Sequence, residues 1–128
     1  MRLLLDTHAF LWWLAGDAAL SSAALAAISD EGNEIFVSAA SVWEMATKHR
    51  IGKLPGLGPI AADLEAAIAV QGFKPLSISL RHGQVAGALP GPHRDPFDRM
   101  LIAQAMLDDL VLVSNEAPFN VYGVRRLW

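Results

Sequence analysis

The chain has 128 residues, a net charge of −3 at pH 7 and no cysteine, and 53% of its residues are hydrophobic. This length predicts one domain, residues 1–128, with a sizeable core. The lack of cysteine excludes disulfides and thiolate zinc sites, and the acidic balance excludes the broad basic surface of a high-affinity nucleic-acid binder.

The mean hydropathy is +0.33, which is high for a small protein. No apolar run reaches the roughly 18 residues needed to span a bilayer, so the surplus predicts surface that a partner covers. The start, MRLLLDTHAF, lacks the long apolar core and the cleavage site of a signal peptide. We therefore expect a cytoplasmic protein that does not associate with a membrane.

Apolar runs separated by capping and turn residues divide the chain into short strands and longer helices. In chain order the pattern predicts a strand at 3–5, helices at 8–15 and 22–29, a strand at 35–37, helices at 38–50 and 60–71, a strand at 76–78, helices at 81–88 and 96–107, and strands at 110–113 and 124–127. This alternation predicts an α/β fold with a parallel sheet of four to five strands and helices on both faces.

Four acidic residues lie just after a predicted strand or early in a predicted helix: Asp6, Glu44, Asp98 and Glu116. In a parallel sheet these positions share the edge where ligands bind. Four carboxylates so close together would repel one another, and a divalent cation is the usual way to neutralise such a cluster. The pattern therefore predicts a metal-dependent hydrolase.

Each acid also has a purely structural interpretation. Asp6 is placed to cap the helix that follows it, and Glu44 is placed for a capping box with Ser41 or an ion pair with Lys48. If Ser38 caps that helix instead, Glu44 moves to its second turn.

The remaining polar residues leave further alternatives. Asp95 and Asp98 flank Pro96, so one of the two is expected to be only a helix cap. Arg99 is placed to pair with a carboxylate or a phosphate. The four histidines show no spacing typical of a metal site.

Four segments resemble PIN-domain ribonucleases of the VapC toxin type: LLLDTHAFLWWL, VSAASVWEMATK, DPFDRMLIAQA and LVSNEAPFNVYGVRRLW. They cover essentially the whole chain in the family's order. The resemblance implies a PIN-like α/β/α sandwich and a toxin that cuts RNA, such as tRNA or rRNA, with Mg²⁺ or Mn²⁺. It also implies a homodimer and a cognate antitoxin, a small DNA-binding protein. The alternative is a non-catalytic PIN fold that binds RNA or a partner.

The resemblance implies a role for each candidate residue. Asp6 and Asp98 match the metal-ligating aspartates. Asp95 is the alternative to Asp98 for the second of these positions. We favour Asp98 because apolar residues follow it at offsets that face the core. Glu44 matches the helix glutamate, and we expect Glu44 and Glu116 to bind the cation through water or to hold a second ion. Ser114 matches the residue that orders the site.

Glu116 stands where the family commonly has aspartate, a change that keeps the charge and lengthens the side chain.

Overall fold

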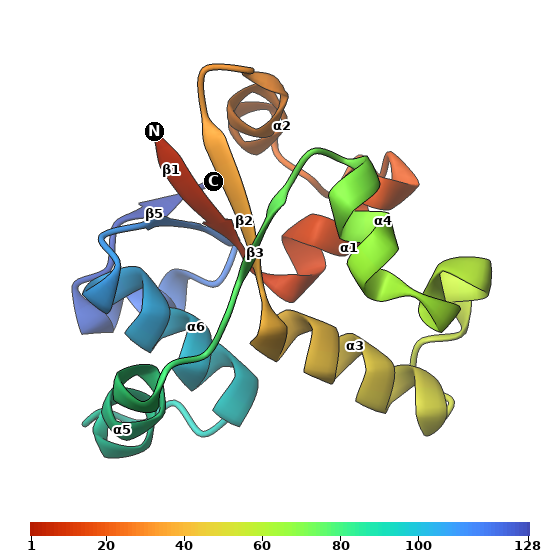
Figure 1. The fold of residues 1–128 in the computed structure, drawn as a ribbon. Coiled ribbons are helices and arrows are strands. Elements are labelled where there is room, and N and C mark those ends of the chain that lie inside the picture. Colours follow the sequence, from red (N-terminus) through yellow and green to blue (C-terminus); the bar gives the residue numbers. More distant parts are fainter.

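The fold is built on a sheet of five parallel strands in the order β3-β2-β1-β4-β5 (Figure 1). The computed structural model describes all 128 residues. The strands are β1 (Arg2–Leu5), β2 (Glu34–Ser38), β3 (Lys74–Leu76), β4 (Val111–Val113) and β5 (Arg126–Leu127). This confirms the predicted α/β fold with a central parallel sheet.

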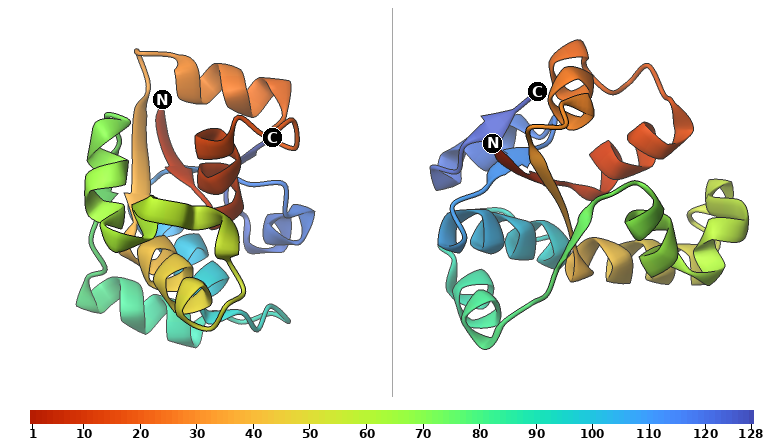
Figure 2. Two further views of the ribbon diagram at one scale, coloured as in Figure 1. Left: turned by 90° about the vertical axis from the view of Figure 1, so that its right-hand side faces the viewer. Right: turned by 45° about the horizontal axis from the view of Figure 1, so that its top comes forward.

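Helices cover both faces of the sheet (Figures 1 and 2). The α-helices are α1 (Thr7–Ala15), α2 (Ser22–Ser29), α3 (Ala39–Arg50), α4 (Leu64–Val70), α5 (Leu80–Ala88) and α6 (Pro96–Leu107). Two 3₁₀ segments, η1 (Pro55–Ala62) and η2 (Ala117–Tyr122), complete the fold. None of the helices is both long and apolar enough to cross a membrane.

The central strand β1 separates two hydrophobic cores because its side chains alternate between the faces of the sheet. Leu3 and Leu5 belong to the core shared with α1, α2 and α4. Leu4 belongs to the core under α6, where it joins Leu101 and Phe119. All three leucines are fully buried, as expected for a strand covered on both sides.

Three predicted boundaries are wrong. Strand β5 begins at Arg126, two residues after the predicted start at 124. Strand β3 begins two residues before the predicted 76–78 run, because its pairing with β2 places Phe36 opposite Lys74. The predicted helix at 60–71 is broken at Asp63, whose φ of −152° and ψ of 81° are not helical: residues up to Ala62 belong to the 3₁₀ segment η1, and the regular helix α4 starts only after Asp63. The Asp63 side chain accepts a hydrogen bond from the Ala66 N–H and caps α4.

The register of the sheet brings three chain segments to one edge. Leu5 at the end of β1 lies opposite Val37 of β2 and Val113 of β4. The residues that follow, Asp6 and Ser114, therefore leave the sheet at the same level. The candidate site lies at this edge.

Candidate active site

Asp6 is 3% exposed and caps α1. Its Oδ1 accepts a hydrogen bond of 2.8 Å from the Ala9 N–H. Burial raises the pKa of Asp6, while the Ser114 hydroxyl, the Ala9 N–H and the charge of His8 lower it, and the charge of Glu116 raises it. The capping interpretation is therefore correct, and the same carboxylate also lies within electrostatic reach of a second acid.

Glu44 lies in the second turn of α3 because Ser38, whose side chain accepts from the Ala40 N–H, is the cap. Its Oε2 accepts a 2.6 Å ion-paired hydrogen bond from Lys48 Nζ, the pairing expected from their spacing. Its Oε1 accepts a 2.6 Å bond from Thr7 Oγ1. Both oxygens of this buried carboxylate are thus held by side chains of the protein.

Thr7 joins the start of α1 to α3. Its hydroxyl lies 2.6 Å from Glu44 Oε1 and 3.1 Å from Ser41 Oγ. A hydroxyl carries one proton and the carboxylate only accepts, so Thr7 donates to Glu44 and accepts from Ser41. Ser41 therefore supports Glu44 through Thr7, and Ser38 rather than Ser41 caps the helix.

Asp95 and Asp98 have different environments. Asp95 is exposed, and its Oδ1 accepts from the N–H groups of Phe97 and Asp98 as the cap of α6. Asp98 faces the site, where its Oδ2 lies 2.8 Å from His93 Nε2. The pKa of Asp98 is raised to about 6: burial raises it most, the hydrogen bond and charge of His93 lower it, and the charges of Asp95 and Glu44 also raise it.

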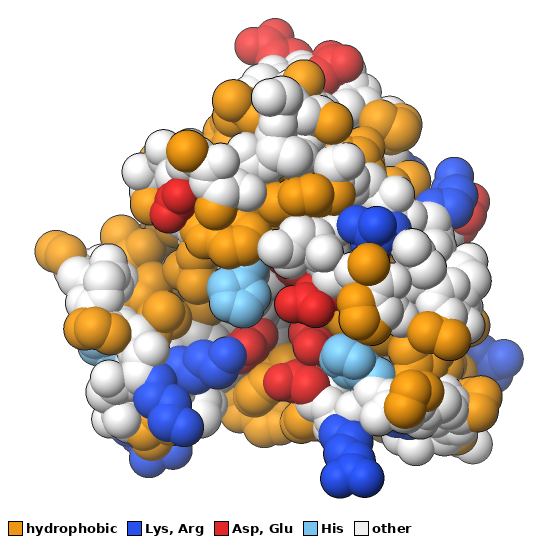
Figure 3. Space-filling view, turned by 180° about the vertical axis from the view of Figure 1, so that it is seen from behind, with side chains coloured by type: hydrophobic (Ala, Val, Ile, Leu, Met, Phe, Trp, Pro, Cys, Tyr) orange, Lys and Arg blue, Asp and Glu red, His pale blue; other side chains and the backbone are white.

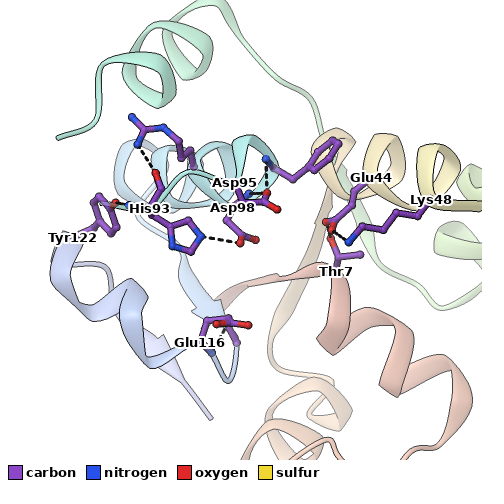
Figure 4. Close-up of polar contacts among 11 residues, drawn as sticks. Thr7, Glu44, Lys48, His93, Asp95, Asp98, Glu116 and Tyr122 are labelled. Carbon is purple, nitrogen blue, oxygen red and sulfur yellow. Dashed lines mark hydrogen bonds and ion pairs between the residues drawn. The ribbon is translucent and has the colours of Figure 1, made fainter. Parts of the chain in front are cut away.

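Glu116 lies between β4 and η2, at the position just before η2 begins. Its N–H donates a 3.0 Å hydrogen bond to the hydroxyl of Ser114, which is fully buried. Glu44 of α3, Asp98 of α6 and Glu116, which lies between β4 and η2, thus come from three separate segments, and Thr7 at the start of α1 lies beside Glu44 (Figure 4). On this face of the molecule, acidic side chains gather in a hollow with histidines beside it (Figure 3).

Arg99 does not pair with a carboxylate. Its Nε and Nη1 donate to the carbonyls of Ala86 and His93, at 3.0 and 2.8 Å. Its Nη2 donates to the carbonyls of Leu89 and Gly87, at 2.5 and 3.5 Å. All its donor groups are therefore directed at the backbone of α5 and of the loop before α6.

Three side chains at the site were not identified from the sequence as site residues: Thr7, Lys48 and His93. The spacing of Lys48 and Glu44 predicted their ion pair, but nothing in it placed the lysine near Asp95 and Asp98. The hydrogen bond to Glu44 raises the pKa of Lys48, and the charges of Glu44, Asp95 and Asp98 raise it further. His93 lies outside the helix that carries Asp98 and contacts it only because the loop folds back. No short-range pattern predicts such a contact.

The side chains as they stand do not form a closed coordination shell, since no three acidic or histidine residues are placed to hold one ion. The type of donor nevertheless fits Mg²⁺ or Mn²⁺, which prefer carboxylate oxygens and retain several waters. Burial raises the pKa of both Asp6 and Asp98, so their charged forms lack compensation that a cation would provide.

The comparisons agree with this architecture. The PIN domain family model matches residues 3–124. Ribonuclease VapC16 of Mycobacterium tuberculosis is 39% identical over 69 residues, which are 54% of this chain and 48% of that protein. The chain therefore spans about half the length of this curated relative.

Two solved structures share the fold. The complex of VapBC2 from Rickettsia felis with a promoter DNA fragment matches with a TM-score of 0.72 at 14% identity, covering 98% of this chain and 97% of the other. VapC20 of Mycobacterium tuberculosis, described as a Sarcin-Ricin loop cleaving toxin, matches with a TM-score of 0.67 at 17% identity, covering 95% of each chain. With the family model spanning nearly the whole sequence, the chain belongs to the PIN domain family.

Proposed function

We propose that this protein is a ribonuclease toxin of the VapC type, formed by a single PIN domain over residues 1–128. It would hydrolyse RNA phosphodiester bonds with Mg²⁺ or Mn²⁺. The observation that carries the proposal is the convergence of four acids at one edge of the sheet: Asp6, Glu44, Asp98 and Glu116. Membership of the PIN domain family and the likeness to Ribonuclease VapC16 support it.

In this proposal Asp6 and Asp98 hold the cation, and Glu44 and Glu116 act on it through water. The bound cation would supply charge stabilisation at the phosphate and an activated water. Thr7 and Lys48 hold the Glu44 carboxylate in place as a proton acceptor. Ser114 supports Asp6 and the N–H of Glu116. Asp95 and Arg99 act indirectly. Asp95 caps α6, and Arg99 holds the preceding loop in place by hydrogen bonds to its carbonyls.

The proposed partners are an RNA substrate, a second copy of the chain and a cognate antitoxin that binds DNA. The description of VapC20 as a Sarcin-Ricin loop cleaving toxin supports a structured RNA such as rRNA or tRNA as the substrate. The complex of VapBC2 with promoter DNA supports the antitoxin. A cytoplasmic location follows from such substrates. Exposed apolar side chains, among them Trp43 at 58% and Leu80 at 96%, provide surface for a homodimer or the antitoxin.

Incubation of the antitoxin-free protein with total tRNA and rRNA tests this proposal. We expect cleavage with Mg²⁺ or Mn²⁺, none with EDTA, and none with Asp6→Asn or Asp98→Asn. Asp95→Asn is the matched control, because asparagine also caps helices and the residue is exposed. Cleavage that survives EDTA and both substitutions would contradict the proposal. Metal binding without cleavage of any RNA would favour the non-catalytic alternative.

A further inference from the structure

We propose that His93 is a positioning residue that orients the Asp98 carboxylate, and that Arg99 acts through it by bracing the loop that carries it. This inference rests on the proposed function, because it assumes that Asp98 holds the cation. The loop consists of residues 89–95 and joins α5 to α6; it is called the α5–α6 loop below.

The side chains of His93 and Asp98 are in direct contact. His93 Nε2 lies 2.8 Å from Asp98 Oδ2, and the two side chains are only 20% and 26% exposed. A carboxylate only accepts, so Nε2 is the donor. No N–H or hydroxyl of the chain bonds Asp98 Oδ1. The contact therefore fixes the torsion of Asp98 while leaving one oxygen available, and ligating carboxylates are commonly oriented by such partners.

His93 is itself held by its backbone N–H, its carbonyl and its ring (Figure 4). Its N–H donates to Tyr122 Oη at 3.1 Å, and its carbonyl accepts from Arg99 Nη1 at 2.8 Å. Its ring packs edge-on against Phe119, with 5.2 Å between the ring centroids, and Phe119 is fully buried. A donor anchored in this way has little rotamer freedom left, so it can impose a conformation on Asp98.

Arg99, which follows Asp98 in α6, holds the α5–α6 loop in place through its guanidinium group. Besides the His93 carbonyl, its guanidinium binds the carbonyl of Leu89 at the start of the α5–α6 loop and that of Ala86 in α5. The planar group supplies several donors in fixed directions, which a lysine ammonium does not. The helix that carries Asp98 thus also holds both ends of the loop that carries His93.

The backbone of the α5–α6 loop is packed closely against Tyr122 at Gly91. Gly91 has a φ of +107°, and a Cβ built there would lie 2.9 Å from Tyr122 Oη. The backbone therefore passes directly against the tyrosine whose hydroxyl accepts the His93 N–H. Loop, η2 and α6 form one assembly around the histidine.

A simpler account is that His93 only packs the loop onto η2. The two accounts differ in whether the Nε2 donor matters. Glutamine places its amide nitrogen close to the position of histidine Nε2, whereas the asparagine amide ends near Nδ1 and falls short of Asp98. His93→Gln and His93→Asn are therefore a matched pair of polar substitutions that differ in reach.

We would measure Mn²⁺ affinity by calorimetry, RNA cleavage and thermal unfolding for both variants, with the exposed His49→Asn as control. His93→Asn is expected to weaken Mn²⁺ binding by about 10- to 100-fold. His93→Gln is expected to recover most of that loss, and His49→Asn to behave like the unsubstituted protein. Equal behaviour of the Gln and Asn variants, whether both bind normally or both lose affinity, would overturn the proposal.

A readout without metal separates this inference from the proposed function. Scalar couplings measured by NMR in the metal-free protein report the χ1 torsion of Asp98. We expect one rotamer in the unsubstituted protein and in His93→Gln, and averaging in His93→Asn. If the unsubstituted protein neither binds Mn²⁺ nor cuts RNA, the proposed function fails, and these couplings still decide whether His93 positions Asp98. One fixed rotamer in His93→Asn would refute the positioning role.

The role of Arg99 is tested by combining substitutions. Arg99→Lys keeps the charge and cannot reach all the carbonyls, so it is expected to weaken Mn²⁺ binding by less than His93→Asn does. If Arg99 acts only through His93, the double variant binds Mn²⁺ as His93→Asn alone does. Losses that multiply in the double variant would show that Arg99 acts by another route.

Discussion

At the scale of single residues, two acids of the site, Asp6 and Asp98, lie where their negative charge is unfavourable. Asp98 combines burial with the nearby charges of Asp95 and Glu44, and its pKa rises to about 6. A raised carboxyl pKa means that the folded state binds the proton more tightly than the unfolded state. The metal-free protein therefore loses stability as the pH rises from about 4 to 6, and the full loss persists above that range.

Neutralising Asp98 should consequently stabilise the metal-free protein. At pH 7.5 in EDTA we expect Asp98→Asn to raise the free energy of unfolding by roughly 1–3 kcal/mol, from a shift of about two pKa units. The gain should become small near pH 4, where the carboxyl is protonated in the folded state and only about half ionised in the unfolded state. Urea denaturation at the two pH values measures this, with the exposed Glu31→Gln as control. A loss of stability at pH 7.5 would show that the Asp98 charge is compensated within the protein.

At the scale of elements, the position of each acid depends on how helices are joined to strands. Gln104 of α6 is fully buried. Its Oε1 accepts a 2.6 Å hydrogen bond from Ser38 Oγ, and its Nε2 donates to the Ser77 carbonyl at 3.3 Å. Because Ser38 caps α3, this amide links the helix of Asp98 to the helix of Glu44.

Gln104→Leu should therefore cost about 1–3 kcal/mol of folding stability, because it leaves the proton of the buried Ser38 hydroxyl without an acceptor and removes the bond to the Ser77 carbonyl. Urea unfolding measures the change. Gln84→Leu, on the exposed side of α5, is the matched control and should change the stability by less than 0.5 kcal/mol or so. Similar effects of the two substitutions would mean that the buried amide does not join the helices.

The elements also show what could be read from the sequence. Helix α6 was predicted with its correct bounds because its signals are local: Asp95 caps it and Pro96 opens it. The displacement of β3 was not predictable in that way, since the strand is placed by pairing with β2. The break ahead of α4 had a local signal in the capping residue Asp63, but the apolar periodicity that continues through this position favoured one longer helix.

The same distinction holds for the site. Asp6 and Asp98 were recognisable because each follows or opens a predicted element and matches a family motif. The contact between His93 and Asp98 was not, because a loop with no regular period brings them together. Arg99 was expected to pair with an anion, and only the path of that loop shows why its donors go to carbonyls instead.

At the scale of the whole molecule, the parallel sheet is what gathers acids that are far apart in the sequence. The central position of β1 puts Asp6 between the ends of β2 and β4, and α6 brings Asp98 to the same edge. The protein has a net charge of −3, and the hollow holds acidic side chains (Figure 3). A polyanionic substrate would therefore be repelled from this hollow until a cation occupies it.

The central claim is that these carboxylates form a divalent-cation site in which Asp98, and not Asp95, is a ligand. Calorimetric titration of the antitoxin-free protein with Mn²⁺ tests it most directly. We predict saturable binding that weakens at least about tenfold in Asp6→Asn and in Asp98→Asn and is unchanged in Asp95→Asn. Unchanged binding in Asp98→Asn together with lost binding in Asp95→Asn, or no saturable binding at all, would contradict it.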